Sequence, residues 1–91
     1  MTLNDLYAII LDRKENPSEK SYTASLFASG LPRIAQKVGE EGTEVVVAAL
    51  ALEDARLIEE LADLAFHSLV LMAARDIRPE DVIAELEKRH K

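Results

Sequence analysis

The sequence predicts an all-α fold, a helical bundle built around two long antiparallel helices and completed by dimerisation. First, only three prolines and three glycines interrupt the 91 residues, so there are few points at which a helix must stop. Second, the segments between these breakers are rich in Ala, Leu and Glu, which favour helix. Third, residues 45–52 are apolar on every side and residues 64–74 nearly so, and such helices need cover all round.

The length of the chain limits it to a single domain over residues 1–91 with a modest core. Two thin flanking helices can hardly cover both central helices. We therefore expect a homodimer in which a second subunit packs against them. The alternative is a monomer whose outer helices wrap around the central hairpin, and the sequence leaves it open.

Composition and charge restrict the classes of function. A formal net charge of −6 argues against nucleic acid as a partner, because proteins that grip a phosphate backbone are basic. The absence of cysteine excludes disulfides, thiolate metal sites and cysteine nucleophiles. The sequence has no signal-peptide pattern at its start and no apolar stretch of membrane-spanning length. We therefore expect a cytoplasmic protein without a membrane partner.

Capping signals predict the first two helices. Thr2 and Asp5 are spaced as in an acidic capping box, and the apolar residues that follow recur at helical spacing, so we expect a helix over residues 3–15. The polar residues 16–23 form the predicted main loop. A serine or threonine near its end is expected to cap a short helix that stops at Gly30.

Three further helices account for the rest of the chain. Pro32 suits the first turn of a helix, and nothing breaks the pattern over residues 32–52. An acidic pair then marks a turn, and a second long helix is expected to end near Arg75. Pro79, followed by two acidic residues, opens a last helix that ends near Arg89.

Two pairs of acidic residues lie within the long predicted helices, Glu41 with Glu44 and Glu60 with Asp63. Members of each pair are three residues apart and project from one helical face. In an antiparallel hairpin the pairs lie at comparable distances from the turn, so they can face each other. Burying like charges beside apolar segments is costly unless a cation lies between them, and carboxylate oxygens suit Mg²⁺ or Mn²⁺. The alternative, two ordinary solvated faces, stays open.

Four short segments carry a resemblance to a known family. Residues 40–44 (EEGTE) and 60–63 (ELAD) match the EExxE and ExxD pattern of the all-α nucleotide pyrophosphatase superfamily, the MazG-like proteins. Residues 21–23 (SYT) and 37–41 (KVGEE) resemble its phosphoribosyl-ATP pyrophosphohydrolase branch. The similarity spans nearly the whole chain, and the combination of segments is more specific than the acidic pattern alone.

The resemblance implies a reaction and a set of site residues. The reaction is Mg²⁺-dependent hydrolysis of phosphoribosyl-ATP to phosphoribosyl-AMP and pyrophosphate, the second step of histidine biosynthesis, by water that the metal activates. The implied catalytic and metal-binding residues are Glu41, Glu44, Glu60 and Asp63, with Glu40 as an added ligand or a base that orients water. The residues expected at the nucleotide substrate are Arg13, Ser21, Tyr22, Thr23, Lys37 and His67.

Simpler interpretations of these residues remain open. Lys37 can form an intrahelical ion pair with Glu41, the SYT segment can serve only as a helix cap, and Arg13 can be solvated. His67 can orient a carboxylate, touch substrate, or lie partly buried with its ring nitrogens satisfied within the helix. Two other classes of function also remain: a housecleaning pyrophosphatase of nucleoside triphosphates, and a non-catalytic dimeric helical module that binds a basic partner protein.

Overall fold

The computed structural model describes residues 1–90, and within this range all regular structure is α-helical. The five helices are α1 (Leu3–Glu15), α2 (Tyr22–Ser29), α3 (Leu31–Ala51), α4 (Asp54–Ala74) and α5 (Pro79–Arg89). The all-α prediction is confirmed, and the helix boundaries fall within a residue or so of those expected. In the described part of the chain, no helix is long and apolar enough to cross a membrane.

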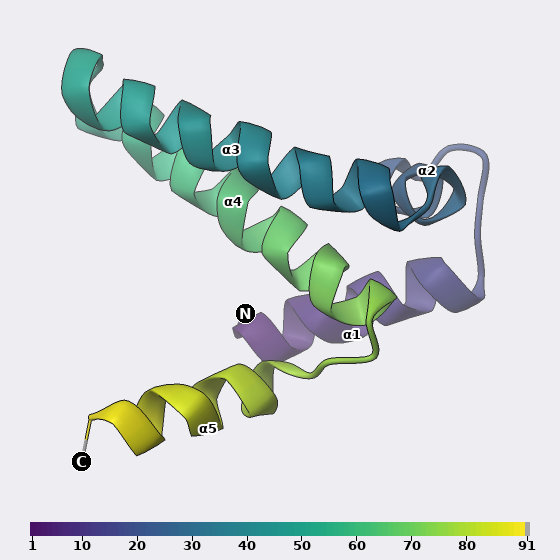
Figure 1. Ribbon diagram of the computed structural model, residues 1–91. Coiled ribbons are helices and arrows are strands. Elements are labelled where there is room, and N and C mark those ends of the chain that lie inside the picture. The colour runs from purple at the N-terminus through teal and green to yellow at the C-terminus, as the bar shows by residue number, and fades with distance from the viewer. Residues whose placement is uncertain (91) are drawn as a thin grey trace.

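The central feature is the hairpin of α3 and α4, which run side by side in opposite directions (Figure 1). Each helix has 21 residues, which corresponds to a length of roughly 31 Å. The chain enters α3 through Gly30, whose φ of 92° is a left-handed conformation that glycine adopts without steric cost. This glycine allows the sharp change of direction between α2 and α3.

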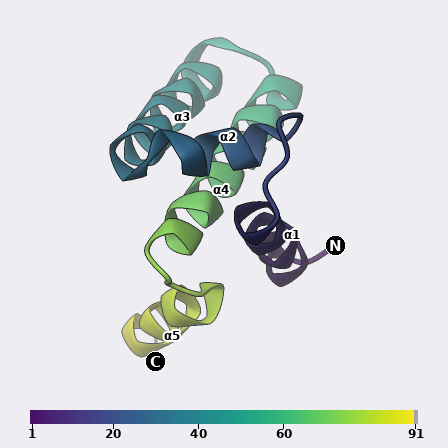
Figure 2. The same ribbon diagram turned by 90° about the vertical axis from the view of Figure 1, so that its right-hand side faces the viewer.

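The helices α1 and α2 lie at the end of the hairpin opposite its turn (Figures 1 and 2). There they build the core with the start of α3 and the end of α4. The buried core residues are Tyr7, Ile10, Leu26, Ile34, Leu69, Val70 and Ala73. Two polar contacts secure the arrangement: the Tyr7 hydroxyl donates to the carbonyl oxygen of Ile77 at 2.6 Å, and the Lys14 ammonium donates to that of Ala73 at 2.8 Å.

The other end of the hairpin and most of α5 are left uncovered by the chain itself. Large apolar side chains are exposed on α3, α4 and α5, among them Val46, Val47, Leu50, Ile58, Leu61, Ile83 and Leu86. The accessible surface of the chain is 6374 Å², whereas a compact monomer of this mass has roughly 5,300 Å². The outer helices therefore do not enclose the hairpin.

Candidate functional site

Three of the five predicted carboxylates meet midway along the hairpin. Glu41 on α3 and Glu60 and Asp63 on α4 each place a carboxylate oxygen within 4.8 Å of the others. Glu41 and Glu60 are 9% and 8% exposed, while Asp63 is open to solvent. Two negative charges 4.8 Å apart repel by about 3.5 kcal/mol at an effective dielectric constant of 20. The cluster therefore needs positive charge close by.

Part of that charge comes from a basic residue one turn away on each helix. The Lys37 ammonium lies 3.3 Å from a carboxylate oxygen of Glu41, and an Arg56 guanidinium nitrogen lies 3.3 Å from one of Glu60. Burial works against the charged form of Lys37, but its contacts with Glu40 and Glu41 outweigh this effect and raise the pKa of the ammonium above its ordinary value. Lys37 is therefore cationic throughout the physiological pH range.

The remaining two predicted carboxylates lie outside the three-residue cluster. Glu44 is exposed on α3, one turn beyond Glu41. Glu40 instead faces two cations, with one carboxylate oxygen 3.3 Å from Arg33 and the other 3.3 Å from Lys37. Its contact with Lys37 lowers the pKa of Glu40, against the smaller opposing effect of burial and with help from Arg33. Glu40 is thus an anion held between two basic side chains.

A chain of hydrogen bonds joins the predicted substrate residues Tyr22 and His67 to the cluster. The Nδ1 atom of His67 lies 2.7 Å from the carbonyl oxygen of Asp63, and its Nε2 atom lies 2.9 Å from the Tyr22 hydroxyl. Because the carbonyl can only accept, Nδ1 carries a proton, and in the neutral ring Nε2 accepts from the tyrosine. His67 is buried and both its ring nitrogens are hydrogen-bonded. The ring therefore links Tyr22 to the Asp63 backbone and does not reach solvent.

Tyr22 remains accessible despite this hydrogen bond. The residue is 52% exposed, and its ring stacks on that of Phe66 with a centroid distance of 6.3 Å and an angle of 29° between the planes. The aromatic ring of a nucleotide base can pack on a surface of this kind. The hydroxyl is held by a buried histidine while the ring stays available to a ligand.

The other predicted substrate residues lie in ordinary structural settings. Ser21 is the N-cap of α2 and accepts a hydrogen bond from the Ala24 amide at 3.1 Å, and partly buried Thr23 follows within the first turn. The Arg13 guanidinium donates to its neighbour Asp12 at 2.7 Å on the exposed side of α1. These residues are therefore not drawn into the carboxylate cluster by contacts within the chain.

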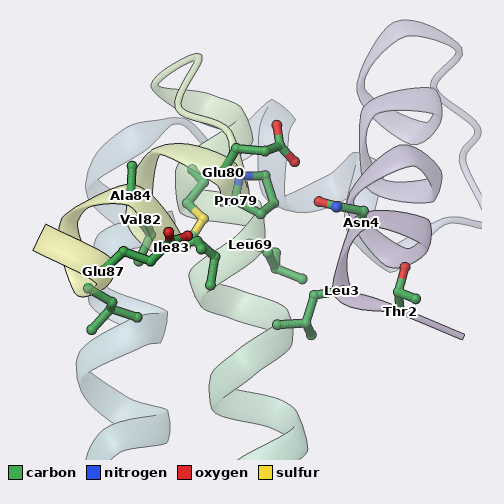
Figure 3. Close-up of a pocket in the computed structure, with 12 residues that line it drawn as sticks. Thr2, Leu3, Asn4, Leu69, Pro79, Glu80, Val82, Ile83, Ala84 and Glu87 are labelled. Atoms are coloured by element: carbon green, nitrogen blue, oxygen red, sulfur yellow. The ribbon is translucent and has the colours of Figure 1, made fainter. Parts of the chain in front are cut away.

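A groove in the described part of the chain does not coincide with the cluster. It has a volume of about 700 Å³ and lies between the start of α1, the second half of α4 and α5 (Figure 3). Its lining is mostly apolar, with Leu3, Leu69 and Ile83 among the residues that face it, and none of the clustered carboxylates belongs to it. Its chemistry suits apolar packing better than phosphate binding.

Sequence reasoning did not single out two basic residues of the site, Arg33 and Arg56. Arg56 precedes Glu60 by four residues, a spacing that favours an ion pair on a helix, and this signal was available in the sequence. Arg33 is seven residues before Glu40, two full turns, and its contact depends on how far the long side chain extends along α3. Only the structure shows that contact.

Comparisons with known proteins agree on one family. A family model described as phosphoribosyl-ATP pyrophosphohydrolase matches residues 3–90. A curated relative named phosphoribosyl-ATP pyrophosphatase from Sulfurisphaera tokodaii is 54% identical over 89 residues, covering 98% of this chain and 95% of the relative. Relatives of the same name from Geotalea daltonii and Saccharolobus solfataricus are each 51% identical, over 96% and 98% of this chain and 82% and 95% of their own length.

Proposed function

The chain belongs to the phosphoribosyl-ATP pyrophosphohydrolase family, so it is a hydrolase of histidine biosynthesis, and we propose that the carboxylate cluster of α3 and α4 is its metal-dependent active site. The reaction divides phosphoribosyl-ATP into phosphoribosyl-AMP and pyrophosphate by adding water across the linkage between the α and β phosphates. The observation that carries this assignment is the convergence of Glu41, Glu60 and Asp63 from two helices that the matched family model covers.

The donor set fits Mg²⁺, with Mn²⁺ as a possible substitute. All of its donors are carboxylate oxygens, which hard divalent cations prefer, and two of the three groups are largely buried. We propose Glu41, Glu60 and Asp63 as ligands, with Glu44 joining them by rotation of its exposed side chain. When bound, Mg²⁺ supplies charge neutralisation for the phosphates and acidifies a water molecule.

The protein's own residues then hold the substrate in place. Lys37 has a raised pKa and stays positively charged beside the cluster, where it stabilises phosphate oxygens through charge-assisted hydrogen bonds. The exposed Tyr22 ring offers a surface for the base or the ribose, and the hydrogen bond from its hydroxyl to His67 limits its rotation. Positioning and electrostatic stabilisation are the main contributions that a protein makes to phosphoryl transfer.

The decisive experiment measures pyrophosphate release from phosphoribosyl-ATP by the purified chain. Release that requires Mg²⁺, stops with a chelator and exceeds release from a panel of nucleoside triphosphates is the expected result. Activity on the panel alone would assign the chain to housecleaning hydrolysis. No metal-dependent turnover of any nucleotide would overturn the enzymatic proposal in favour of a binding module.

We further propose that the chain works as a homodimer in the cytoplasm. The exposed apolar side chains of the hairpin, such as Leu50 at 84% and Ile58 at 66%, support this. The accessible surface exceeds that of a compact monomer by roughly 1,100 Å², which is comparable to the area each partner buries in a standard interface, about 800 Å². Sedimentation equilibrium at micromolar concentration tests it, with a mass twice 10.1 kDa as the expected result.

A further inference from the structure

Arg33, Lys37 and Glu40 form a charged row along one face of α3, immediately before the carboxylate cluster. Their spacing of four and then three residues places them on neighbouring turns. The two oxygens of the Glu40 carboxylate are divided between the cations, one 3.3 Å from Arg33 and the other 3.3 Å from Lys37. Lys37 also lies 3.3 Å from Glu41, so the row is continuous with the proposed metal site.

The ion pair between Arg33 and Glu40 contributes little to the stability of the fold. The side chains of Arg33 and Glu40 are 46% and 43% exposed, and ion pairs between such groups are weak because water screens them and two long side chains must be ordered. A stronger anion can therefore replace the Glu40 carboxylate at small cost. The space between Arg33 and Lys37 can hold an anion, since the Glu40 carboxylate already occupies it.

We propose that Arg33 is a further substrate-binding residue, which with Lys37 binds the two phosphate groups that are released as pyrophosphate. In the free protein Glu40 acts as an exchangeable counterion that holds the two cations in position until these phosphates displace it. The inference rests on the proposed function, because it assumes that the scissile linkage lies at the cluster of Glu41, Glu60 and Asp63.

The geometry favours the released phosphates over the phosphate of the phosphoribosyl group. Lys37 contacts Glu40 and the cluster residue Glu41 with the same ammonium, so an anion in the place of the Glu40 carboxylate adjoins the cluster. In the substrate the β phosphate adjoins the scissile linkage and the γ phosphate follows directly, whereas the phosphoribosyl phosphate is separated from the linkage by two sugars and a base. The planar guanidinium of Arg33 also remains charged at every accessible pH and presents paired donors to phosphate oxygens.

The test compares Arg33→Gln with the matched control Arg89→Gln. Arg89 is likewise exposed on a helix and paired with a glutamate, Glu85 at 3.1 Å, but it lies on α5. Calorimetric titration of each purified chain with inorganic pyrophosphate in the presence of Mg²⁺ should show affinity about tenfold weaker for Arg33→Gln, as expected for one lost charged contact. The control should match the wild type within twofold.

Two additional measurements separate the possible reasons for such a loss. Ribose 5-phosphate serves as a second probe, and a loss of its binding with unchanged pyrophosphate binding would overturn the assignment to the released phosphates. Glu40→Gln should bind pyrophosphate at least as tightly as the wild type, because it removes the competing anion. Much weaker binding in Glu40→Gln would instead make Glu40 a metal ligand and contradict its place as a counterion.

The outcomes also distinguish this inference from the proposed function. A wild-type chain that does not hydrolyse phosphoribosyl-ATP would sink the proposed function whatever Arg33 does. Normal wild-type turnover, together with equal pyrophosphate affinity and an equal KM in Arg33→Gln and Arg89→Gln, would refute the inference alone. Partial recovery of pyrophosphate binding in Arg33→Lys would confirm that the lost element is positive charge.

Discussion

The carboxylate cluster predicts an unusual combination for Glu41→Gln: loss of activity without loss of stability. The Glu41 carboxylate gains about 5 kcal/mol from the Lys37 ammonium at 3.3 Å and loses about 3.5 kcal/mol to Glu60 within 4.8 Å, both at an effective dielectric constant of 20. Repulsion from Asp63, which water screens because that residue is exposed, and the desolvation of the buried Glu41 carboxylate offset what remains. Neutralising Glu41 should therefore change the free energy of unfolding by less than about 1 kcal/mol in the absence of metal.

The effect should appear when metal is added. At a Mg²⁺ concentration 100 times the dissociation constant, the wild type gains about 2.7 kcal/mol of stability, and Glu41→Gln should gain almost none. Chemical denaturation with and without Mg²⁺, at a fixed protein concentration, measures both quantities. Turnover of phosphoribosyl-ATP should fall by on the order of a thousandfold, since the variant lacks a ligand of the metal that stabilises the reacting phosphates.

The control for this experiment is Glu85→Gln, which removes an exposed helical carboxylate paired with Arg89. It should keep the turnover and the stabilisation by Mg²⁺ of the wild type. A Glu41→Gln protein that unfolds far more easily without metal would refute the charge balance derived above. Full turnover in both Glu41→Gln and Asp63→Asn would refute the assignment of the cluster as the active site.

Three other substitutions test separate parts of the structure. Tyr7→Phe removes the hydrogen bond to Ile77 and should lower the free energy of unfolding by about 1 kcal/mol. Because burial raises the pKa of Tyr7 above 10.0, the stability from the neutral hydroxyl is complete below that pH and is lost as pH rises through the raised pKa. Denaturation at pH 9 and pH 11 should therefore show an alkaline loss of stability in the wild type that the variant lacks. Tyr22→Phe and His67→Leu should each raise the KM for phosphoribosyl-ATP, and the double variant should be no worse than the worse single one, because both break the same hydrogen bond; additive effects would show that the two side chains act independently. Leu50→Lys places a charge on an 84% exposed apolar position and should shift the chain towards monomer in sedimentation experiments, while an unchanged mass would place the interface elsewhere.

The helix boundaries could be predicted from the sequence because the signals that set them are local. Thr2 and Asp5 form the expected capping box, with the Asp5 amide 3.0 Å from the threonine hydroxyl. Ser21 caps α2, Gly30 ends it with a positive φ, and Pro79 lies in the first turn of α5. Each of these decisions involves residues within one turn of one another, so no knowledge of the tertiary structure was needed.

The contents of the site could be predicted only in part, since they depend on how the two long helices are rotated about their axes. Periodicity places Glu41 and Glu44 on one face, but that face spans a wide arc. The packing of α3 against α4 turns Glu41 inwards to Glu60 and leaves Glu44 exposed. The fate of His67 was likewise left open by spacing alone, and only the position of Tyr22 on α2 shows how its second ring nitrogen is satisfied.

The distribution of charge around the cluster explains how a chain with a net charge of −6 keeps several carboxylates together. Lys37 and Arg56 reach the cluster from opposite helices, but their side chains are 18% and 52% exposed, so water screens the arginine more effectively. Lys37 is the stronger of the two compensating charges and the one that also contacts Glu40. Because the same ammonium compensates the empty cluster and faces the proposed phosphate site, Lys37→Met should destabilise the metal-free protein as well as weaken pyrophosphate binding. Arg33→Gln should weaken pyrophosphate binding without changing the stability. Chemical denaturation and pyrophosphate titration of both variants therefore test whether Lys37 stabilises the cluster and Arg33 contacts only the substrate.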